Sequence, residues 1–150
     1  MKKIVSILVG GLMAAALFAG CGSTAASSAY KDGTYKASYK DFDDHGWKSQ
    51  VEVTIKDGKI SDAKFDCVNA DGKLKSQDAD NNSSMKKVSK TSPEEFQPKL
   101  AADLVAKQDI EKVDSVTGAT NSSNDFKKLA KAALDNAKAG KTEEAVVENK

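Results

Sequence analysis

The chain has 150 residues, a formal net charge of +1 and 23 basic residues, all of them lysines. Once an N-terminal leader is set aside, the remainder has the size of one domain. The near balance of charge, with no basic stripe or known nucleic-acid-binding motif, argues against a nucleic-acid partner. Because arginine is absent, any phosphate group must be held by backbone N–H groups, hydroxyls, lysines or a covalent bond.

The N-terminus has the three-part layout of a secretory signal peptide. Lys2 and Lys3 precede an apolar run over 4–18, and small residues follow that run. The run is too short and too rich in glycine to span a membrane comfortably. We therefore expect residues 1–20 to be a signal peptide that is removed during export.

The segment 17–21, Leu-Phe-Ala-Gly-Cys, resembles a lipobox, in which the thiolate of Cys21 is the nucleophile that accepts diacylglycerol. Phe18 is bulkier than the residue usually found there, and the alternative is an ordinary signal with an incidental cysteine. We expect Cys21 to carry lipid, and residues 21–30 to form a tether. The protein would then be anchored to the extracytoplasmic face of the cell membrane.

Neither a disulfide nor a metal site is predicted. The second and last cysteine, Cys67, lies in an alternating segment where a small buried thiol is expected. His45 is the only histidine, and the sequence has no Cys-x-x-Cys-His motif, so haem attachment and zinc binding have no support.

Three segments with alternating apolar residues predict three strands, over 35–39, 51–55 and 60–68. The Asp57-Gly58 pair between the second and third segments indicates a type I′ hairpin, because both central residues of that turn need a positive φ. Residues 69–72 predict another turn. Residues 78–84 are expected to be a polar loop, followed by a short helical turn over 85–88.

The C-terminal half predicts helices. Ser92 and the Pro-Glu-Glu after it are typical of a helix start, but Pro98 should interrupt the helix, which gives one turn over 93–97 and a helix over 98–107. Apolar residues at three- and four-residue spacing predict a last helix that begins after 121–123 and ends at Ala139. Residues 141–150 are expected to be a charged mobile tail. These elements predict an α+β fold, a small antiparallel sheet with a hairpin packed on two or three helices.

The segment 114–120, Asp-Ser-Val-Thr-Gly-Ala-Thr, leads into the last helix. A helix N-terminus has free N–H groups and favours negative charge, and small residues allow the backbone to approach a ligand closely. Ser122 and Asp125 have the spacing of a reciprocal cap. The segment therefore suits a phosphate, although many helix starts are rich in serine and threonine for capping alone.

The same segment matches, at every fixed position, the D-x-x-[ST]-G-A-T pattern of the FMN-binding domain family. This family includes flavin subunits of the sodium-pumping NADH:quinone reductase and of the Rnf complex, and flavin lipoproteins of extracellular electron transfer in Gram-positive bacteria. The resemblance continues outside the motif, at 32–35, 51–60, 69–74 and 92–96. It covers roughly 31–139 and implies an FMN-binding domain over residues 31–140.

The resemblance also implies residue roles. In the family, an FAD:protein FMN transferase attaches FMN by a phosphoester to the last threonine of the motif, which is Thr120 here. Gly118 and Ala119 would give the transferase access, and Asp114 and Thr117 would be recognition or orienting residues. Ser122 is a further candidate for cofactor binding, and a cap formed by Ser122 and Asp125 would leave the neighbouring hydroxyls free.

A second candidate segment lies between the first two strands. His45 and Trp47 flank a glycine, and an exposed aromatic side chain there could stack on the isoalloxazine ring of the flavin. The alternative is that Trp47 packs on the sheet and that His45 is solvated.

The resemblance, together with the expected lipid anchor, implies an electron-transfer flavoprotein that takes electrons from a membrane quinol or flavin oxidoreductase. No general acid, base or nucleophile is apparent, so we expect a redox carrier rather than a stand-alone enzyme. One alternative is a lipid-anchored binding or adhesion module that has the same fold but no covalent flavin. Another is a separate signalling role for the leader peptide, over 13–20.

Overall fold

The structure is a computed structural model that describes residues 30–149. The predicted signal peptide and the lipidation site at Cys21 lie outside the described residues, as does the predicted tether up to residue 29. Within 30–149, no helix combines the length and the apolar character needed to cross a membrane.

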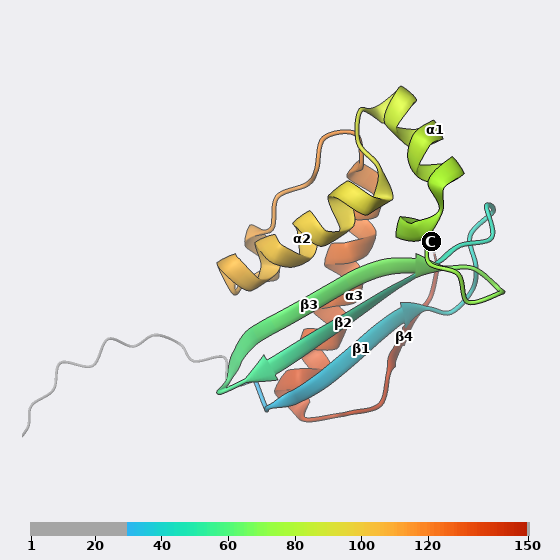
Figure 1. The fold of residues 1–150 in the computed structure, drawn as a ribbon. Coiled ribbons are helices and arrows are strands. Elements are labelled where there is room, and N and C mark those ends of the chain that lie inside the picture. Colours follow the sequence, from blue (N-terminus) through green and yellow to red (C-terminus); the bar gives the residue numbers. More distant parts are fainter. Residues whose placement is uncertain (1–29, 150) are drawn as a thin grey trace, which may run out of the picture.

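Strands come first in the chain and helices follow, with one short strand at the end (Figure 1). The strands are β1 (Gly33–Tyr39), β2 (Lys48–Lys56), β3 (Lys59–Val68) and β4 (Ala145–Val147). The α-helices are α1 (Ala79–Ser89), α2 (Pro93–Lys107) and α3 (Thr120–Ala139). Two short 3-10 helices are η1 (Lys75–Gln77) and η2 (Ile110–Lys112).

The four strands form one sheet in the order β3-β2-β1-β4. β1, β2 and β3 are antiparallel neighbours, whereas β4 pairs with β1 in parallel. The predicted α+β class is confirmed, and the sheet is mixed because of β4.

The predicted β2–β3 hairpin is also confirmed. Asp57 and Gly58 have φ values of 53° and 71°, as a type I′ turn requires. The carboxylate of Asp32 accepts hydrogen bonds from the N–H groups of Asp57 (3.0 Å) and Gly58 (2.9 Å). The residue just before β1 therefore fastens the turn at the same end of the sheet.

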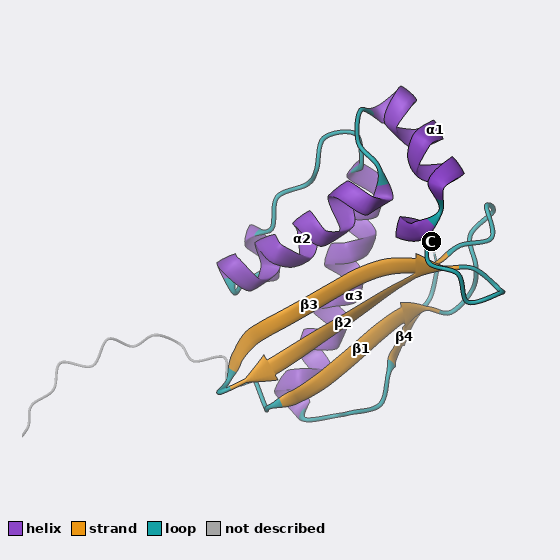
Figure 2. Ribbon diagram, viewed as in Figure 1, coloured by secondary structure: helices purple, strands orange, loops and turns teal. Residues whose placement is uncertain are grey.

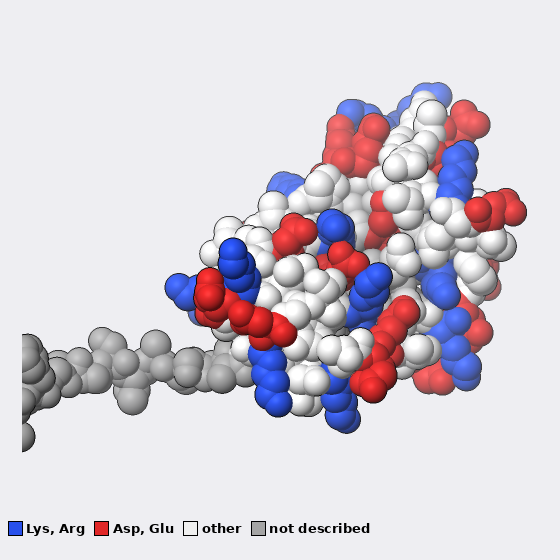
Figure 3. Space-filling view, turned by 60° about the horizontal axis from the view of Figure 1, so that its bottom comes forward, with Lys and Arg blue, Asp and Glu red and all other residues white. Residues whose placement is uncertain are grey.

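Two helices cover one face of the sheet, with α3 passing behind the strands and α2 lying beside β3, whereas α1 projects beyond the end of the sheet (Figures 1 and 2). Alternate strand residues point into this layer, and the rings of Phe65 on β3 and Phe126 on α3 lie 5.2 Å apart. On the opposite face, Glu52 lies between Lys36 and Lys64, 3.2 Å from each. Acidic and basic side chains are interspersed over the face in Figure 3.

The polar loop expected at 78–84 is wrong, because these residues belong to α1 and its cap. The Asp78 carboxylate accepts from the N–H of Asn81 (2.9 Å). Buried Asn82 donates its amide to Ser76 O (2.7 Å) and accepts from the N–H of Glu94 (3.2 Å). Capping and these distant contacts stabilise a helix that has little apolar character of its own.

The interruption expected at Pro98 is wrong as well, because α2 runs without a break from Pro93 to Lys107. Proline removes one intrahelical hydrogen bond, here the one to the carbonyl of the exposed Glu94 near the helix start. The helix buries Phe96, Leu100 and Leu104 in the core, and this burial outweighs the lost bond.

The C-terminal segment differs from the expected mobile tail, because Ala145–Val147 form β4. The N–H of Lys40 donates to Val147 O (2.9 Å), and the ammonium of Lys128 donates to Glu148 O (2.9 Å). The segment after α3 thus returns along the free edge of β1.

Candidate functional site

The segment 114–120 connects η2 to α3, and α3 begins at Thr120 rather than after 121–123. Most of the segment is exposed, including the side chain of Thr120, whereas Ala119 is buried. The last residue of the motif is therefore the first residue of a helix and faces solvent.

Gly118 shapes the turn before the helix. The N–H of Ala119 donates to Val116 O (2.9 Å), and Gly118 has a φ of +84° at the third position of that turn. A Cβ atom at Gly118 would lie 2.2 Å from the carbonyl oxygen of Ser89. Both the backbone conformation and the close approach to the end of α1 therefore require glycine.

Ser123 is a structural residue of the site that the sequence analysis missed. Its side chain is fully buried, and its hydroxyl accepts from the N–H of Val116 (3.0 Å) and donates to Ala119 O (2.8 Å). These two bonds hold the turn formed by residues 116–119 against the start of α3. The only signal was the three hydroxyl residues at 120, 122 and 123, and the sequence does not say which of them faces inward.

The reciprocal cap expected from Ser122 and Asp125 is wrong. Ala119 is the N-cap residue, and no side chain caps the helix. Asp125 instead accepts from the hydroxyl of Tyr39 on β1 (2.7 Å). Burial and the Asp125 carboxylate raise the pKa of Tyr39 above its usual value.

The start of α3 has the features that suit an anion. No acceptor lies within hydrogen-bonding distance of the N–H groups of Thr120, Asn121 and Ser122 among the described residues. The first turn contains no acidic residue, and the Thr120 hydroxyl is exposed beside these donors. A phosphate joined to that hydroxyl would lie where free N–H groups and the helix dipole favour it. The residues present therefore fit the phosphate end of FMN.

Asp114, the first residue of the motif, fastens the segment to α2. Lys107 lies 2.6 Å from the Asp114 carboxylate and 3.0 Å from the Asp103 carboxylate, which also accepts the N–H of Asp114 (3.0 Å). Partial burial acts to raise the pKa of Asp103, but the bonds from Asp114 and Lys107 hold it below its usual value. The carboxylates of Asp114 and Asp103 raise the pKa of Lys107.

The second candidate segment, which contains His45 and Trp47, makes no direct polar contact with 114–120 among the described residues. Trp47 is buried, and the ammonium of Lys75 lies 5.5 Å from its ring, whereas His45 is exposed. The Asp43 carboxylate accepts from the N–H groups of both residues, at 2.9 and 2.8 Å. Among the described residues, no hydrogen bond or ion pair links His45 or Trp47 to 114–120. Stacking of either residue on a flavin remains a prediction.

Cys67 lies in the core, 7% exposed, with its sulfur 3.3 Å from the hydroxyl of Ser49. Burial raises the pKa of the thiol to about 11, so it stays protonated at neutral pH. This is the small buried thiol that the alternating pattern predicts.

The sequence model of the FMN-binding domain matches residues 45–135, more than half of the chain, and this span contains all of 114–120. The chain belongs to the FMN-binding domain family.

The chain is also similar to two bacterial proteins. The chain is 43% identical over 116 residues to a protein of Treponema pallidum (strain Nichols) named 15 kDa lipoprotein, an alignment that covers 77% of this chain and 82% of the relative. It is 42% identical to a Clostridium perfringens protein of known crystal structure, with a TM-score of 0.78, over 81% of this chain and 99% of that one.

Proposed function

We propose that the protein is a membrane-anchored redox carrier with FMN joined to Thr120 by a phosphoester. It accepts electrons from a quinol or flavin oxidoreductase in the membrane and passes them to an acceptor outside the cell. The observation that carries the proposal is the exposed hydroxyl of Thr120 beside three free N–H groups, at the end of a motif typical of the family.

Attachment requires a second protein, an FAD:protein FMN transferase. The Thr120 oxygen bonds to the phosphorus of the FMN half of FAD, the bond from that phosphorus to the AMP oxygen breaks, AMP leaves, and the hydroxyl proton passes to solvent. The chain supplies an accessible hydroxyl, and the small residues Gly118 and Ala119 that precede it would give the transferase room to approach. The free N–H groups of Asn121 and Ser122 then hold the phosphate oxygens.

FMN, when bound, supplies the redox chemistry, and the chain positions it. A covalent bond suits an exported protein without arginine, because a small cofactor held only by backbone groups would be lost by dilution. Ser123 and Asp114 keep the attachment site rigid through their bonds to the turn and to α2.

Membrane attachment rests on the lipobox-like segment that ends at Cys21 and on the relative named as a lipoprotein. A lipid anchor would keep the flavin near a membrane donor. The alternative, an anchored binding module without flavin, predicts the same anchor and no modification of Thr120.

The proposal is tested by coexpression with a flavin transferase of this class. Intact mass spectrometry of the wild-type chain should show the added mass of one FMN less one water, and in-gel flavin fluorescence should survive denaturation. Thr120→Ala should abolish both signals, whereas Ser122→Ala, two residues away, should keep them. A wild-type chain without the added mass would support the binding module instead.

A further inference from the structure

A hollow of about 400 Å³ lies between α2 and the motif segment. On the α2 side it is lined by Lys99, Ala102, Asp103 and Ala106, and on the other side by Ser115 and Val116. We call it the α2 pocket. Its volume falls within the range of small-molecule sites, about 300–1,000 Å³. We propose that the α2 pocket seats the isoalloxazine ring of the flavin, an inference that rests on the proposed attachment to Thr120.

The pocket is within reach of the attachment point. Val116 and Ala119 are the first and last residues of one turn, so their Cα atoms lie within about 7 Å, and Thr120 follows at about 3.8 Å. The Cα atoms of Thr120 and of the pocket residue Val116 are thus no more than about 11 Å apart. The ribityl phosphate of FMN is long enough to cover such a distance.

The lining suits a flat ring with one apolar and one polar end. Ala102 and Ala106 are four residues apart on one face of α2, and both are exposed. Since neither side chain extends beyond Cβ, a ring can lie flat along the helix. Lys99 and Ser115 supply polar groups for the ring carbonyls. The carboxylates of Asp103 and Asp114, which also line the pocket, are both paired with Lys107.

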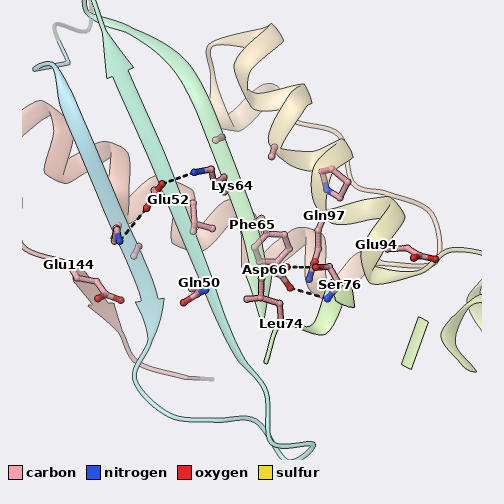
Figure 4. Close-up of a pocket in the computed structure, with 16 residues that line it drawn as sticks. Gln50, Glu52, Lys64, Phe65, Asp66, Leu74, Ser76, Glu94, Gln97 and Glu144 are labelled. Carbon is pink, nitrogen blue, oxygen red and sulfur yellow. Dashed lines mark hydrogen bonds and ion pairs between the residues drawn. The ribbon is translucent and has the colours of Figure 1, made fainter. Parts of the chain in front are cut away.

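A larger groove of about 670 Å³ is the competing seat (Figure 4). It lies over the solvent face of the sheet, where Glu52 and Lys64 form an ion pair, and α2 borders it through Gln97. No residue of 114–120 lines the groove. The α2 pocket, in contrast, is partly built from the motif itself, and this difference favours it.

The α2 pocket is shallow, but a covalently attached ring does not need a tight site. Attachment to Thr120 raises the local concentration of the ring to the millimolar range or above, so a weak pocket is filled most of the time.

The first test uses the flavin-loaded chain and iodide quenching of flavin fluorescence, which reports how far solvent reaches the ring. The variant Ala102→Leu/Ala106→Leu fills the pocket and keeps good helix formers. It should load FMN as the wild type does, and its ring should be quenched more strongly, with a shifted flavin midpoint potential. Ala139→Leu, at the far end of α3, and Gln50→Leu, in the groove, should behave as the wild type.

Equal quenching and potential in the wild type and the double leucine variant would overturn the inference while the proposed attachment stands. A change in Gln50→Leu alone would place the ring in the groove. Circular dichroism and thermal unfolding confirm that each variant is folded.

The second test does not depend on covalent attachment. Millimolar FMN is added to the ¹⁵N-labelled Thr120→Ala chain, with inorganic phosphate as the comparison. FMN, but not phosphate, should shift the amide signals of Ala102, Ala106 and Val116. Shifts at Gln50 and Lys64 instead, or none beyond those that phosphate produces, would contradict the proposed seat even if mass spectrometry shows FMN on Thr120.

Discussion

The backbone N–H of Lys31 donates to the carbonyl oxygen of Ala137 at 3.0 Å, which fixes the start of the domain beside the last turns of α3. Thr120 is the first residue of the same helix. At a rise of 1.5 Å per residue, Thr120 and Ala137 are about 25 Å apart. The proposed lipid anchor at Cys21 therefore joins one end of the domain, and the proposed flavin joins the other.

The length of the tether should then control electron transfer from the membrane. From Cys21 to Tyr30 the chain can extend roughly 30 Å, enough for the domain to turn its flavin end towards the membrane. Deletion of residues 23–28 should slow reduction of the flavin by donor-containing vesicles and leave reduction by dithionite unchanged. A Gly/Ser replacement of equal length is the matched control and should keep the wild-type rate. Equal rates in the deletion variant would contradict this arrangement.

Ser123→Ala should destabilise the protein. The N–H of Val116 would lose its acceptor in a partly buried place, which costs about 1 kcal/mol in the free energy of unfolding. The looser turn should also lower the fraction of chains that acquire FMN. Urea unfolding and intact mass measure the two effects. Ser122→Ala, at a partly exposed position without a capping bond, is the control. If the two variants have the same stability and loading, Ser123 does not hold the turn.

Gly118→Ala should be more harmful than the same change at Gly72. Both glycines have a positive φ, +84° and +79°, so each alanine carries a backbone strain of about 1 kcal/mol. At Gly72 the new Cβ atom meets open space, whereas at Gly118 it meets Ser89 O at 2.2 Å. The collision should cost about 2 kcal/mol more. Urea unfolding of both variants measures the difference in their free energies of unfolding. Equal losses of stability would show that the backbone of Ser89 does not exclude a side chain at position 118.

The Tyr39–Asp125 pair should make the protein less stable at alkaline pH. The pKa of Tyr39 is raised in the folded state above its usual 10.0, so the folded state holds the proton more tightly. This contribution is fully present below about pH 10 and is lost as the pH rises further. Unfolding free energies from about pH 8 to about pH 11 should fall more steeply in the wild type than in Tyr39→Phe. Parallel curves would mean that Tyr39 titrates normally.

Local signals in the sequence predicted several features correctly. The Asp57-Gly58 pair determines its own turn, because glycine and aspartate accept the positive φ that the hairpin needs. The regular spacing of apolar residues along α3 is likewise a local property. It predicted the helix correctly except for its start, which lies at Thr120. The segment 114–120 was recognised through its match to the pattern of the FMN-binding domain family, because its residue types alone also fit simple helix capping.

The features that the sequence did not predict depend on distant contacts. α1 is mostly polar, and Asn82 joins it to Ser76 and Glu94. β4 forms by pairing with the otherwise free edge of β1. The three residues of β4 alone do not predict this pairing. The inward orientation of Ser123, and the choice between the α2 pocket and the groove, follow only from the packing of α2 and α3.

The most direct test of the central claim is tandem mass spectrometry of one tryptic peptide from the coexpressed protein. Cleavage after Lys112 and Lys127 releases residues 113–127, which contain all the hydroxyls of the segment and of the first turn of α3. The fragment ions should place one FMN phosphoester on Thr120. FMN on another hydroxyl of this peptide, such as Ser115 or Thr117, or no FMN on it at all, would contradict the account.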